Sequence, residues 1–420
     1  MRIAVIGAGV VGVTTAHELA ADGHAVTVFD RHGSVAAEAS FGNAGLVAPG
    51  YVAPWAAPGM ARKVLGHLGR AHAPVRIGGR IGATTLAWLW RWWRATRPDV
   101  HARNRSRMHR LADFSRDRLH ELKARLHLDY EQASGFLVLL RTARDIELAA
   151  PGIRTLQALG AKPDLLDAAG CRVIEPGLST ETPLAGGVYS ADDEVGNCRE
   201  FTHLLRHEAE RCGARFRLDT AVDGIAGGPA PRVRLASGEE PFDAIVVCAG
   251  VGSRRLLKPL GVHVPILPVW GHSVTAPLRD DAASLHREPR AALMDERYKV
   301  AISRMGRRVR VAGSAEIARV PAAADERAQR TLDKVLDDWF PGITKRGEAQ
   351  RWVGARPMLP DGPPVLGPSG VDGVWLNLGH GGSGWALACG SAKLLADAIA
   401  GRPNPIALDG LGIERLRNGG

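Results

Sequence analysis

Three glycines near the start of the chain have the spacing of a dinucleotide-binding turn. Gly7, Gly9 and Gly12 form the pattern GxGxxG between two apolar runs, and the second run ends on Asp30. A strand, a glycine-rich turn, a helix and a second strand, with an acid about twenty residues past the glycines, are the fingerprint of an adenine dinucleotide site. A glycine-rich turn without a ligand is the alternative, and the pattern does not separate FAD from NAD(H).

Each position in this turn has a physical role. Gly7 would allow a tight turn, Gly9 would let the backbone approach the pyrophosphate, and Gly12 would let the helix pack closely on the strand. The helix N-terminus, with the N–H groups of Val10 and Val11, would present a partial positive charge to the phosphates. The acid would accept hydrogen bonds from the ribose hydroxyls of adenosine and would repel a 2′-phosphate.

A strand, a glycine-rich turn and a helix N-terminus recur near the end of the chain. An apolar run over residues 374–378 leads into Gly379-His-Gly-Gly-Ser-Gly384, and an apolar helix pattern covers residues 385–400. Residues 31–60 form a long loop, and a loop of that length in a compact domain is usually functional. Small residues in this loop would let its backbone approach a ligand: Ser40, Gly42, Asn43, Ala44 and Gly45.

The composition of the chain argues against several other classes of protein. The 420 residues carry a net charge of +10, from 54 basic and 44 acidic residues. An arginine-rich surface explains this balance better than nucleic-acid binding, because no nucleic-acid motif accompanies the charge. The five cysteines show neither metal-ligand spacing nor a disulfide framework, so we expect no metal site and a reducing compartment. With no signal-peptide pattern and no apolar run long enough to span a bilayer, we expect a cytoplasmic location.

Four of the ten tryptophans lie in one segment, residues 83–94. A helical wheel divides its apolar residues between two faces, with Leu86, Leu89, Trp90 and Trp93 on one and Trp88 and Trp92 on the other. One face can be core. The other is either core or a subunit contact, or it lies at a membrane surface, where tryptophan and the arginines of residues 83–97 are both favourable. We take Trp88 and Trp92 as the pair with which to test lipid contact, and the oligomeric state stays open.

The remaining periodic patterns predict an alternation of strands and helices. Expected helices cover residues 104–126, 149–159, 199–212 and 325–340. Expected strands cover residues 136–140, 186–190, 215–218, 232–235, 243–250, 264–275, 291–303 and 307–313. We therefore expect an α/β fold, with a discontinuous dinucleotide domain interleaved with an α+β second domain.

Five stretches together carry a resemblance to a known family over nearly the whole chain. They are GAGVVGVTTAHELAADGHAVTVFDR, SFGNAGLVAPGYVAPWAAPG, DERYKVAI, GARPMLPDGPPVLG and WLNLGHGGSGWALACG. With these stretches the chain resembles the FAD-dependent D-amino-acid dehydrogenases of the small-subunit type, within the D-amino-acid oxidase, glycine oxidase and sarcosine oxidase superfamily. Many families share the first stretch, whereas APGYVAPWAAPG and DERYKVAI are much narrower.

The resemblance implies an architecture and an activity. It implies a discontinuous Rossmann-like FAD-binding domain (1–55, 195–262 and 352–420) interleaved with an antiparallel-sheet substrate domain (56–194 and 263–351). It implies non-covalent FAD, hydride transfer from D-amino acids that gives 2-oxo acids and ammonia, and electrons passed to a quinone or another acceptor besides oxygen. A peripheral site on the inner membrane would suit that acceptor. The alternatives are an oxidase that makes hydrogen peroxide, a hydroxyproline or imino-acid dehydrogenase, and a non-catalytic FAD-bearing docking subunit.

The resemblance also implies roles for individual residues. Arg356, in the RP motif, would bind the substrate carboxylate with its planar fork of donors. Tyr298 would be a second substrate contact, Tyr51 and His272 would be pocket walls, and His380 would be either an acid–base group or a residue used through its backbone. FAD would be held by the first turn and by Asp30, Arg31, Ser40, Asn43, Ala44, Gly45, Val222, Ala249, Gly250, Gly379, Gly381, Gly382, Ser383 and Gly384.

Overall fold

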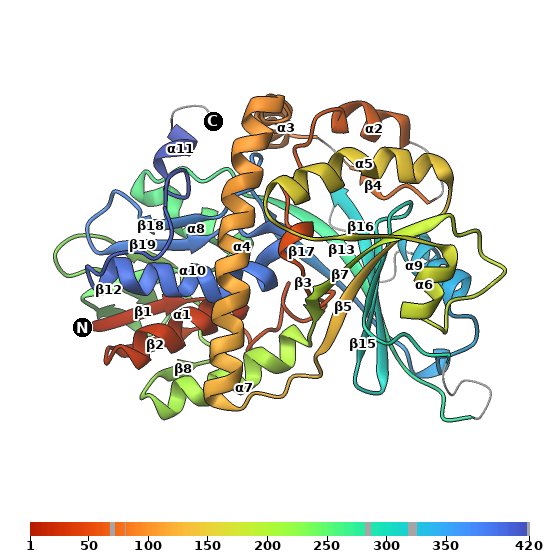
Figure 1. Cartoon of the computed structure of the whole chain (residues 1–420). Coiled ribbons are helices and arrows are strands. Elements are labelled where there is room, and N and C mark those ends of the chain that lie inside the picture. Colours follow the sequence, from red (N-terminus) through yellow and green to blue (C-terminus); the bar gives the residue numbers. More distant parts are fainter. Residues whose placement is uncertain (68–71, 80, 282–286, 318–325, 418–420) are drawn as a thin grey trace.

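The chain forms two large β-sheets, each with helices packed against it (Figure 1). The computed structural model describes residues 1–67, 72–79, 81–281, 287–317 and 326–417. One sheet is mostly parallel and the other is mostly antiparallel. The mixed α/β fold that the sequence predicts is therefore confirmed.

The first sheet has six strands and contains the first glycine-rich unit. Its order is β18-β19-β12-β1-β2-β8, and all neighbours are parallel except β18 and β19. Its central strands are continuous apolar runs, as expected for a sheet covered on both faces. The strands are β1 (Arg2–Ile6), β2 (Ala25–Phe29), β8 (Arg215–Arg217), β12 (Ala244–Val247), β18 (Val365–Pro368) and β19 (Val374–Leu378).

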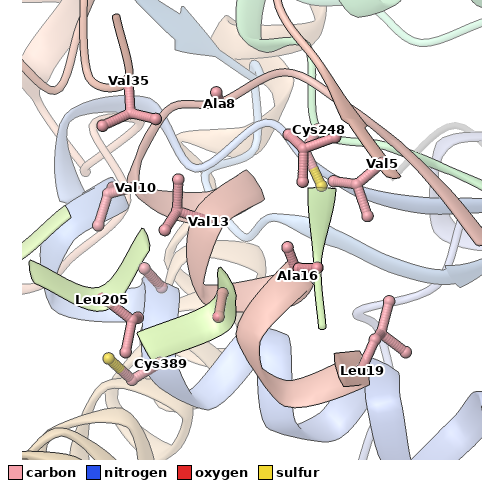
Figure 2. Close-up of a cluster of buried hydrophobic side chains, with 14 of the residues drawn as sticks. Val5, Ala8, Val10, Val13, Ala16, Leu19, Val35, Leu205, Cys248 and Cys389 are labelled. Atoms are coloured by element: carbon pink, nitrogen blue, oxygen red, sulfur yellow. The ribbon is translucent and has the colours of Figure 1, made fainter. Parts of the chain in front are cut away.

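Three helices cover one face of this sheet in a layer. Helix α1 (Val10–Ala21) packs between α7 (Cys198–Arg211) and α10 (Gly384–Ile399). Figure 2 shows the side chains that fill the contact, among them Val13 and Ala16 of α1, Leu205 of α7 and Cys389 of α10. Because α1 is enclosed on several sides, it is apolar around most of its circumference.

The second sheet has the order β17-β13-β16-β15-β14-β5-β7-β3, with β4 beside β16 and β6 beside β7. All its pairings are antiparallel except β14 with β5 and β16 with β4. The strands are β3 (Leu46–Val47), β4 (Val75–Ile77), β5 (Ala133–Leu140), β6 (Asp164–Asp167), β7 (Gly186–Val195), β13 (Leu267–Pro277), β14 (Ala292–Asp295), β15 (Val300–Met305), β16 (Arg308–Ile317) and β17 (Gln350–Met358).

The remaining elements surround the two sheets. A small antiparallel sheet is formed by β9 (Gly224–Ala226), β10 (Arg232–Leu235) and β11 (Gly238–Pro241). The long helix α4 runs across the molecule in front of α10 (Figure 1) and packs against it. The further helices are α2 (Met60–His67), α3 (Ala83–Ala95), α4 (Pro98–Leu126), α5 (Ala143–Ala158), α6 (Ala168–Ile174), α8 (Ser253–Leu257), α9 (Glu326–Trp339) and α11 (Glu414–Arg417). Short 3-10 turns are η1 (Pro49–Tyr51), η2 (Gly250–Gly252), η3 (Lys258–Leu260), η4 (Arg346–Glu348) and η5 (Gly381–Ser383).

Several details differ from the sequence expectation. Helix α4 begins six residues before the expected residue 104, and the strand expected over residues 291–303 is divided into β14 and β15. Helix α5 begins six residues before the expected residue 149, because Thr142 and Asp145 form a reciprocal capping box, and Pro151 lies inside the helix. Strands β3 and β17 both pair within the second sheet, although they lie in segments assigned to the FAD-binding domain. The domain boundaries stay a prediction, and these pairings show that the two sheets share chain segments at the junction.

Candidate active site

A cavity of about 1110 Å³ is lined by residues of both sheets. The six-stranded sheet contributes the turn after β1, the segment after β12 and the turn after β19. The ten-stranded sheet contributes Arg356 of β17, His272 of β13 and Ala312 of β16. Residues from the start, middle and end of the chain therefore meet at one site, as the sequence predicts for the two glycine-rich turns.

The first glycine-rich turn has no room for a side chain at Gly7 or Gly12. Gly7 has a φ of +110°, and a Cβ atom there would lie 2.6 Å from the carbonyl oxygen of Cys248. A Cβ atom at Gly12 would lie 1.8 Å from the carbonyl oxygen of Gly7. Gly7, Gly9, Val10 and Val11 line the cavity, whereas Gly12 does not. Gly12 therefore serves the close packing of α1 on the turn.

Asp30 and Ser40 hold the same turn in place. The Asp30 carboxylate accepts hydrogen bonds from the backbone N–H of Ala8 at 2.7 Å and of His32 at 2.9 Å. The Ser40 hydroxyl accepts a hydrogen bond from the N–H of Val10 at 3.0 Å. Both residues line the cavity. Asp30 can therefore still contact the ribose, and Ser40 can still contact the phosphates, as the sequence predicts.

The loop after Ser40 is fixed by the second sheet. The Ser303 hydroxyl donates to the carbonyl oxygen of Ala44 at 2.6 Å, and the Arg310 guanidinium donates to that of Asn43 at 2.8 Å. The indole N–H of Trp385 donates to the carbonyl oxygen of Gly45 at 3.1 Å. Asn43 and Ala44 line the cavity and Gly45 does not. Gly45 packs against the backbone of Gly196, where an added Cβ atom would lie 2.6 Å from the carbonyl oxygen.

Arg356 is a half-buried cation on the cavity wall. Its Nη1 donates to the carbonyl oxygen of Ser314 at 2.8 Å. The guanidinium lies over Gly271, where an added Cβ atom would approach it to 2.2 Å. Burial lowers the pKa of Arg356 to about 10, so the group stays charged at neutral pH. Among the described residues no carboxylate forms an ion pair with Arg356, and a buried charge without a counter-ion favours an anionic ligand.

The surroundings of His380 do not favour a role in acid–base chemistry. The Nε2 atom of its ring lies 3.0 Å from the Ser391 hydroxyl of α10. Burial lowers the pKa of His380 to about 3, so the ring is neutral at the pH of the cell. A β-bridge between His380 and Met358 joins the second glycine-rich turn to β17. These contacts favour the interpretation in which His380 acts through its backbone.

The two tyrosines occupy different places. Tyr51 lies at the cavity rim, where its ring packs edge-on against Phe136 and its hydroxyl lies 3.5 Å from the carboxylate of Glu296. Burial and that carboxylate raise the pKa of Tyr51 to about 12, so its hydroxyl keeps its proton. Tyr298 does not line the cavity, and its ring lies 5.0 Å from the Arg141 guanidinium. The turn between β14 and β15 places the Tyr298 side chain against the apolar cluster beside α9, away from the cavity, so the geometry gives no support to the predicted substrate contact.

The other predicted cofactor positions do line the cavity. They are Arg31, Val222, Ala249, Gly250, Gly379, Gly381, Gly382, Ser383 and Gly384, and His272 is also a wall residue. The carbonyl oxygen of Val222 accepts a hydrogen bond from Arg255 at 2.7 Å. Helix α10 follows η5 without a side-chain cap, so its first N–H groups are available to a ligand.

One wall residue was missed by the sequence analysis. The Trp352 indole lines the cavity and stacks on Phe41, with the ring centroids 6.1 Å apart. Added Cβ atoms at Gly42 and Gly354 would overlap this indole, at 2.0 and 1.8 Å. Residues two apart on a strand share one face, and this holds for Trp352, Gly354 and Arg356. Their spacing in the sequence could have indicated that Trp352 lies on the same side as Arg356.

No other class of site appears in the part of the chain that the structure describes. It contains no group of three or more His, Cys, Asp or Glu side chains that could hold a metal ion. None of its helices has both the length and the apolar character needed to cross a bilayer.

A parallel sheet with glycine-rich turns, opening on a cavity with an arginine on its wall, is typical of a dinucleotide-dependent enzyme. A family model described as FAD dependent oxidoreductase (DAO) matches residues 2–398. The chain is 44% identical to a D-amino acid dehydrogenase of Cereibacter sphaeroides, over 99% of this chain and 95% of the relative. It is 42% identical to a D-amino acid dehydrogenase of Rhizorhabdus wittichii, over 99% and 100%.

Solved structures show the same fold. Glycine oxidase from Bacillus cereus superposes with a TM-score of 0.71 at 22% identity, over 96% of both chains. Glycine oxidase from Geobacillus kaustophilus gives a TM-score of 0.73 at 19% identity, over 98% of both chains. The chain belongs to the DAO family of FAD-dependent oxidoreductases, and FAD is therefore its cofactor.

The cavity residues fit this cofactor. The glycines of both turns leave space for a ligand against the backbone, and two helix N-termini, of α1 and α10, meet the cavity. A helix N-terminus favours negative charge through its free N–H groups and its dipole. The first turn would hold the pyrophosphate, and the second turn would lie against the flavin.

Proposed function

We propose that the enzyme deaminates D-amino acids to 2-oxo acids and ammonia, without oxygen as the main acceptor. The single observation that carries the proposal is Arg356, a half-buried cation that faces the cavity next to the second glycine-rich turn and has no carboxylate partner among the described residues. An amino acid has one carboxylate, and an arginine fork binds it bidentately. The D preference rests on the two relatives, which are D-amino acid dehydrogenases.

The residues of the chain bind the cofactor and the substrate and orient the substrate. FAD, when bound, accepts a hydride from the substrate α-carbon. Arg356 would fix the carboxylate and so orient the α-carbon. The N–H groups at the start of α10 would stabilise negative charge on the ligand that they face. No protein base is needed if the substrate amine binds neutral, which agrees with the low pKa of His380.

FAD is proposed to be non-covalent. Cys248 is the one cysteine that lines the cavity among the described residues. Burial raises the pKa of its thiol to about 12, so a nucleophilic thiolate is disfavoured at neutral pH. Release of free flavin from acid-precipitated protein would support this proposal, and flavin that stays with the protein pellet would contradict it.

The acceptor is proposed to be a quinone reached at a membrane surface, with α3 as the contact. Leu86, Trp90 and Trp93 are 57%, 57% and 53% exposed, whereas Trp88 and Trp92 are buried. The lipid-facing pair named from the sequence was therefore wrong: Trp88 and Trp92 form the core face. Arg91, Arg94 and Arg97 are exposed beside the outer tryptophans, a combination suited to an anionic interface.

The product and the acceptor test the proposed function. Purified enzyme with a D-amino acid and an artificial acceptor should release ammonia and 2-oxo acid in equal amounts. Reoxidation of the reduced enzyme should be fast with a quinone and slow in air. Rapid formation of hydrogen peroxide in air would show an oxidase, and no product with any amino acid would contradict the proposal.

Liposome binding tests the role of α3. Trp90→Ser with Trp93→Ser should reduce co-sedimentation with anionic liposomes roughly tenfold or more, because two apolar anchors are lost. Leu165→Ser with Val173→Ser is the matched control, since both side chains are exposed elsewhere. Equal binding of both double variants would contradict the assignment of α3.

A further inference from the structure

We infer that the apolar part of the cavity beneath α3, lined by Trp55, Met60 and Val64, binds the ring of a lipid-soluble quinone. This inference rests on the proposed function, since it assigns the place at which the proposed acceptor binds. We call this part of the cavity the apolar lobe.

The lobe lies directly under the helix that carries the outer tryptophans. Trp55 lines the cavity, and its ring lies 6.4 Å from that of Trp88 and 6.0 Å from that of Trp92. The same apolar cluster includes Met60 and Val64. Helix α3 therefore has one face on the lobe and the opposite face exposed, so contact of α3 with lipid would bring the lobe to the membrane.

One side chain, that of Met358, connects the lobe with the second glycine-rich turn. Met358 lines the cavity and packs against the cluster under α3. Its carbonyl oxygen accepts a hydrogen bond from the indole N–H of Trp88 at 3.1 Å. A Cβ atom at Gly381 would lie 2.8 Å from the Met358 sulfur. An apolar ligand in the lobe would thus approach the turn that is expected to face the flavin.

The side chains that define the lobe are apolar and reach the surface, and His101, whose Nδ1 lies 2.9 Å from the carbonyl oxygen of Ala56, and Arg105 also line the cavity. Trp55 and Met60 are half-buried, while Val64 and Val75 are buried deeper along the same lining. A different part of the cavity rim is charged, with Tyr51 beside Glu296 and Lys299. A zwitterionic amino acid suits the charged rim and a quinone suits the lobe, so the two reactants need not share one entrance.

The overall exchange balances. Amino acid, quinone and water give 2-oxo acid, ammonium ion and quinol. The Cα–H and N–H bonds of the amino acid supply two electrons and two protons, and the quinone takes up two of each. Water provides the oxygen of the new carbonyl group.

Narrowing the lobe tests the inference. Val64→Trp should fill it, and Val173→Trp makes the same change at an exposed site. With decylubiquinone as the probe, equilibrium dialysis of the FAD-loaded enzyme should give a Kd raised roughly tenfold or more by Val64→Trp, because a filled pocket excludes its ligand. Reoxidation of the reduced enzyme by decylubiquinone should slow by a similar factor, while reoxidation by ferricyanide stays unchanged. Val173→Trp should behave as the wild type.

Two further outcomes keep the test decisive. If Val64→Trp does not fold, Met60→Lys places a charge in the lobe and should weaken decylubiquinone binding in the same way. Unchanged quinone Kd and reoxidation in a folded lobe variant would overturn the inference, even when D-amino acids reduce the flavin normally. Failure of every D-amino acid to reduce the wild-type flavin would contradict the proposed function instead, and the dialysis would still report on the lobe.

Discussion

Arg356 combines two properties that rarely occur together. Its guanidinium is largely desolvated yet stays charged, and it faces a cavity. The free energy of such a group is improved by a bound carboxylate, because the ligand replaces lost hydration. The sequence pointed to Arg356 through its motif, but the position of the guanidinium on the cavity wall, over Gly271, could be learned only from the fold.

Replacement of Arg356 should weaken catalysis more than it weakens the fold. Arg356→Ala should cost roughly 2–5 kcal/mol in kcat/KM, and Arg356→Lys should recover part of it, because an ammonium group lacks the bidentate fork. Arg351→Ala is the control on the same strand, since Arg351 is partly exposed and pairs with Asp333. Kinetics with a full FAD content measure the effect, and wild-type kcat/KM for both Arg356 variants would refute the assignment.

The buried His380 ring should make the protein sensitive to acid. Its pKa is lowered from 6.5 to about 3 in the folded state, so only the unfolded chain takes up a proton as the pH falls through 6.5. Between pH 7.5 and 4.5 this effect should lower the free energy of unfolding by on the order of 2–3 kcal/mol. Urea unfolding of wild type and His380→Asn measures it, and the variant should lose less stability on acidification. Identical pH dependence would show that the ring is not held neutral.

At the scale of elements, apolar periodicity predicted most helices and strands. Helices α3, α7, α9 and α10 begin and end within about two residues of the predicted limits, whereas α4 and α5 each begin six residues earlier than predicted. What periodicity could not decide was which of two apolar faces of α3 is buried. That choice depends on Trp55, which lies about thirty residues earlier in the chain and packs on the inner face only in the folded protein.

The two faces of α3 should respond differently to truncation. Trp88→Ala should destabilise the protein by roughly 3–5 kcal/mol, because it removes a buried ring. Trp90→Ala should change the free energy of unfolding by less than about 0.5 kcal/mol, as for most exposed positions. Chemical denaturation compares the two, and equal losses would contradict the orientation of the helix.

The first turn should tolerate no side chain at Gly12. Gly12→Ala would place a Cβ atom 1.8 Å from the carbonyl oxygen of Gly7, so the turn must open and the N-terminus of α1 must shift. We expect loss of most bound FAD, measured by the ratio of flavin to protein absorbance. Gly23→Ala is the control, because Gly23 has open space around it, although its φ of +84° makes a small stability loss expected. Full FAD content in Gly12→Ala would contradict this role.

At the scale of the whole molecule, the sequence predicted two glycine-rich turns at one cofactor and a second, antiparallel sheet. It did not predict that β17 is an edge strand whose Met358 also bridges to His380. Nor did it reveal that Trp352 lines the cavity or that Tyr298 packs against the cluster beside α9, away from the cavity. These placements depend on the register between strands far apart in sequence, and local patterns do not contain that information.

Because the two sheets meet at one cavity, Arg356 and the second glycine-rich turn lie on its wall together. The central claim is that a D-amino acid carboxylate binds Arg356 and that the α-carbon then reduces the flavin. Anaerobic bleaching of the flavin absorbance by the two enantiomers of one amino acid tests it most directly. The account predicts rapid bleaching of the wild type by the D-enantiomer, little by the L-enantiomer, and much slower bleaching of Arg356→Ala by either. Equal bleaching by both enantiomers, or bleaching of Arg356→Ala at the wild-type rate, would contradict it.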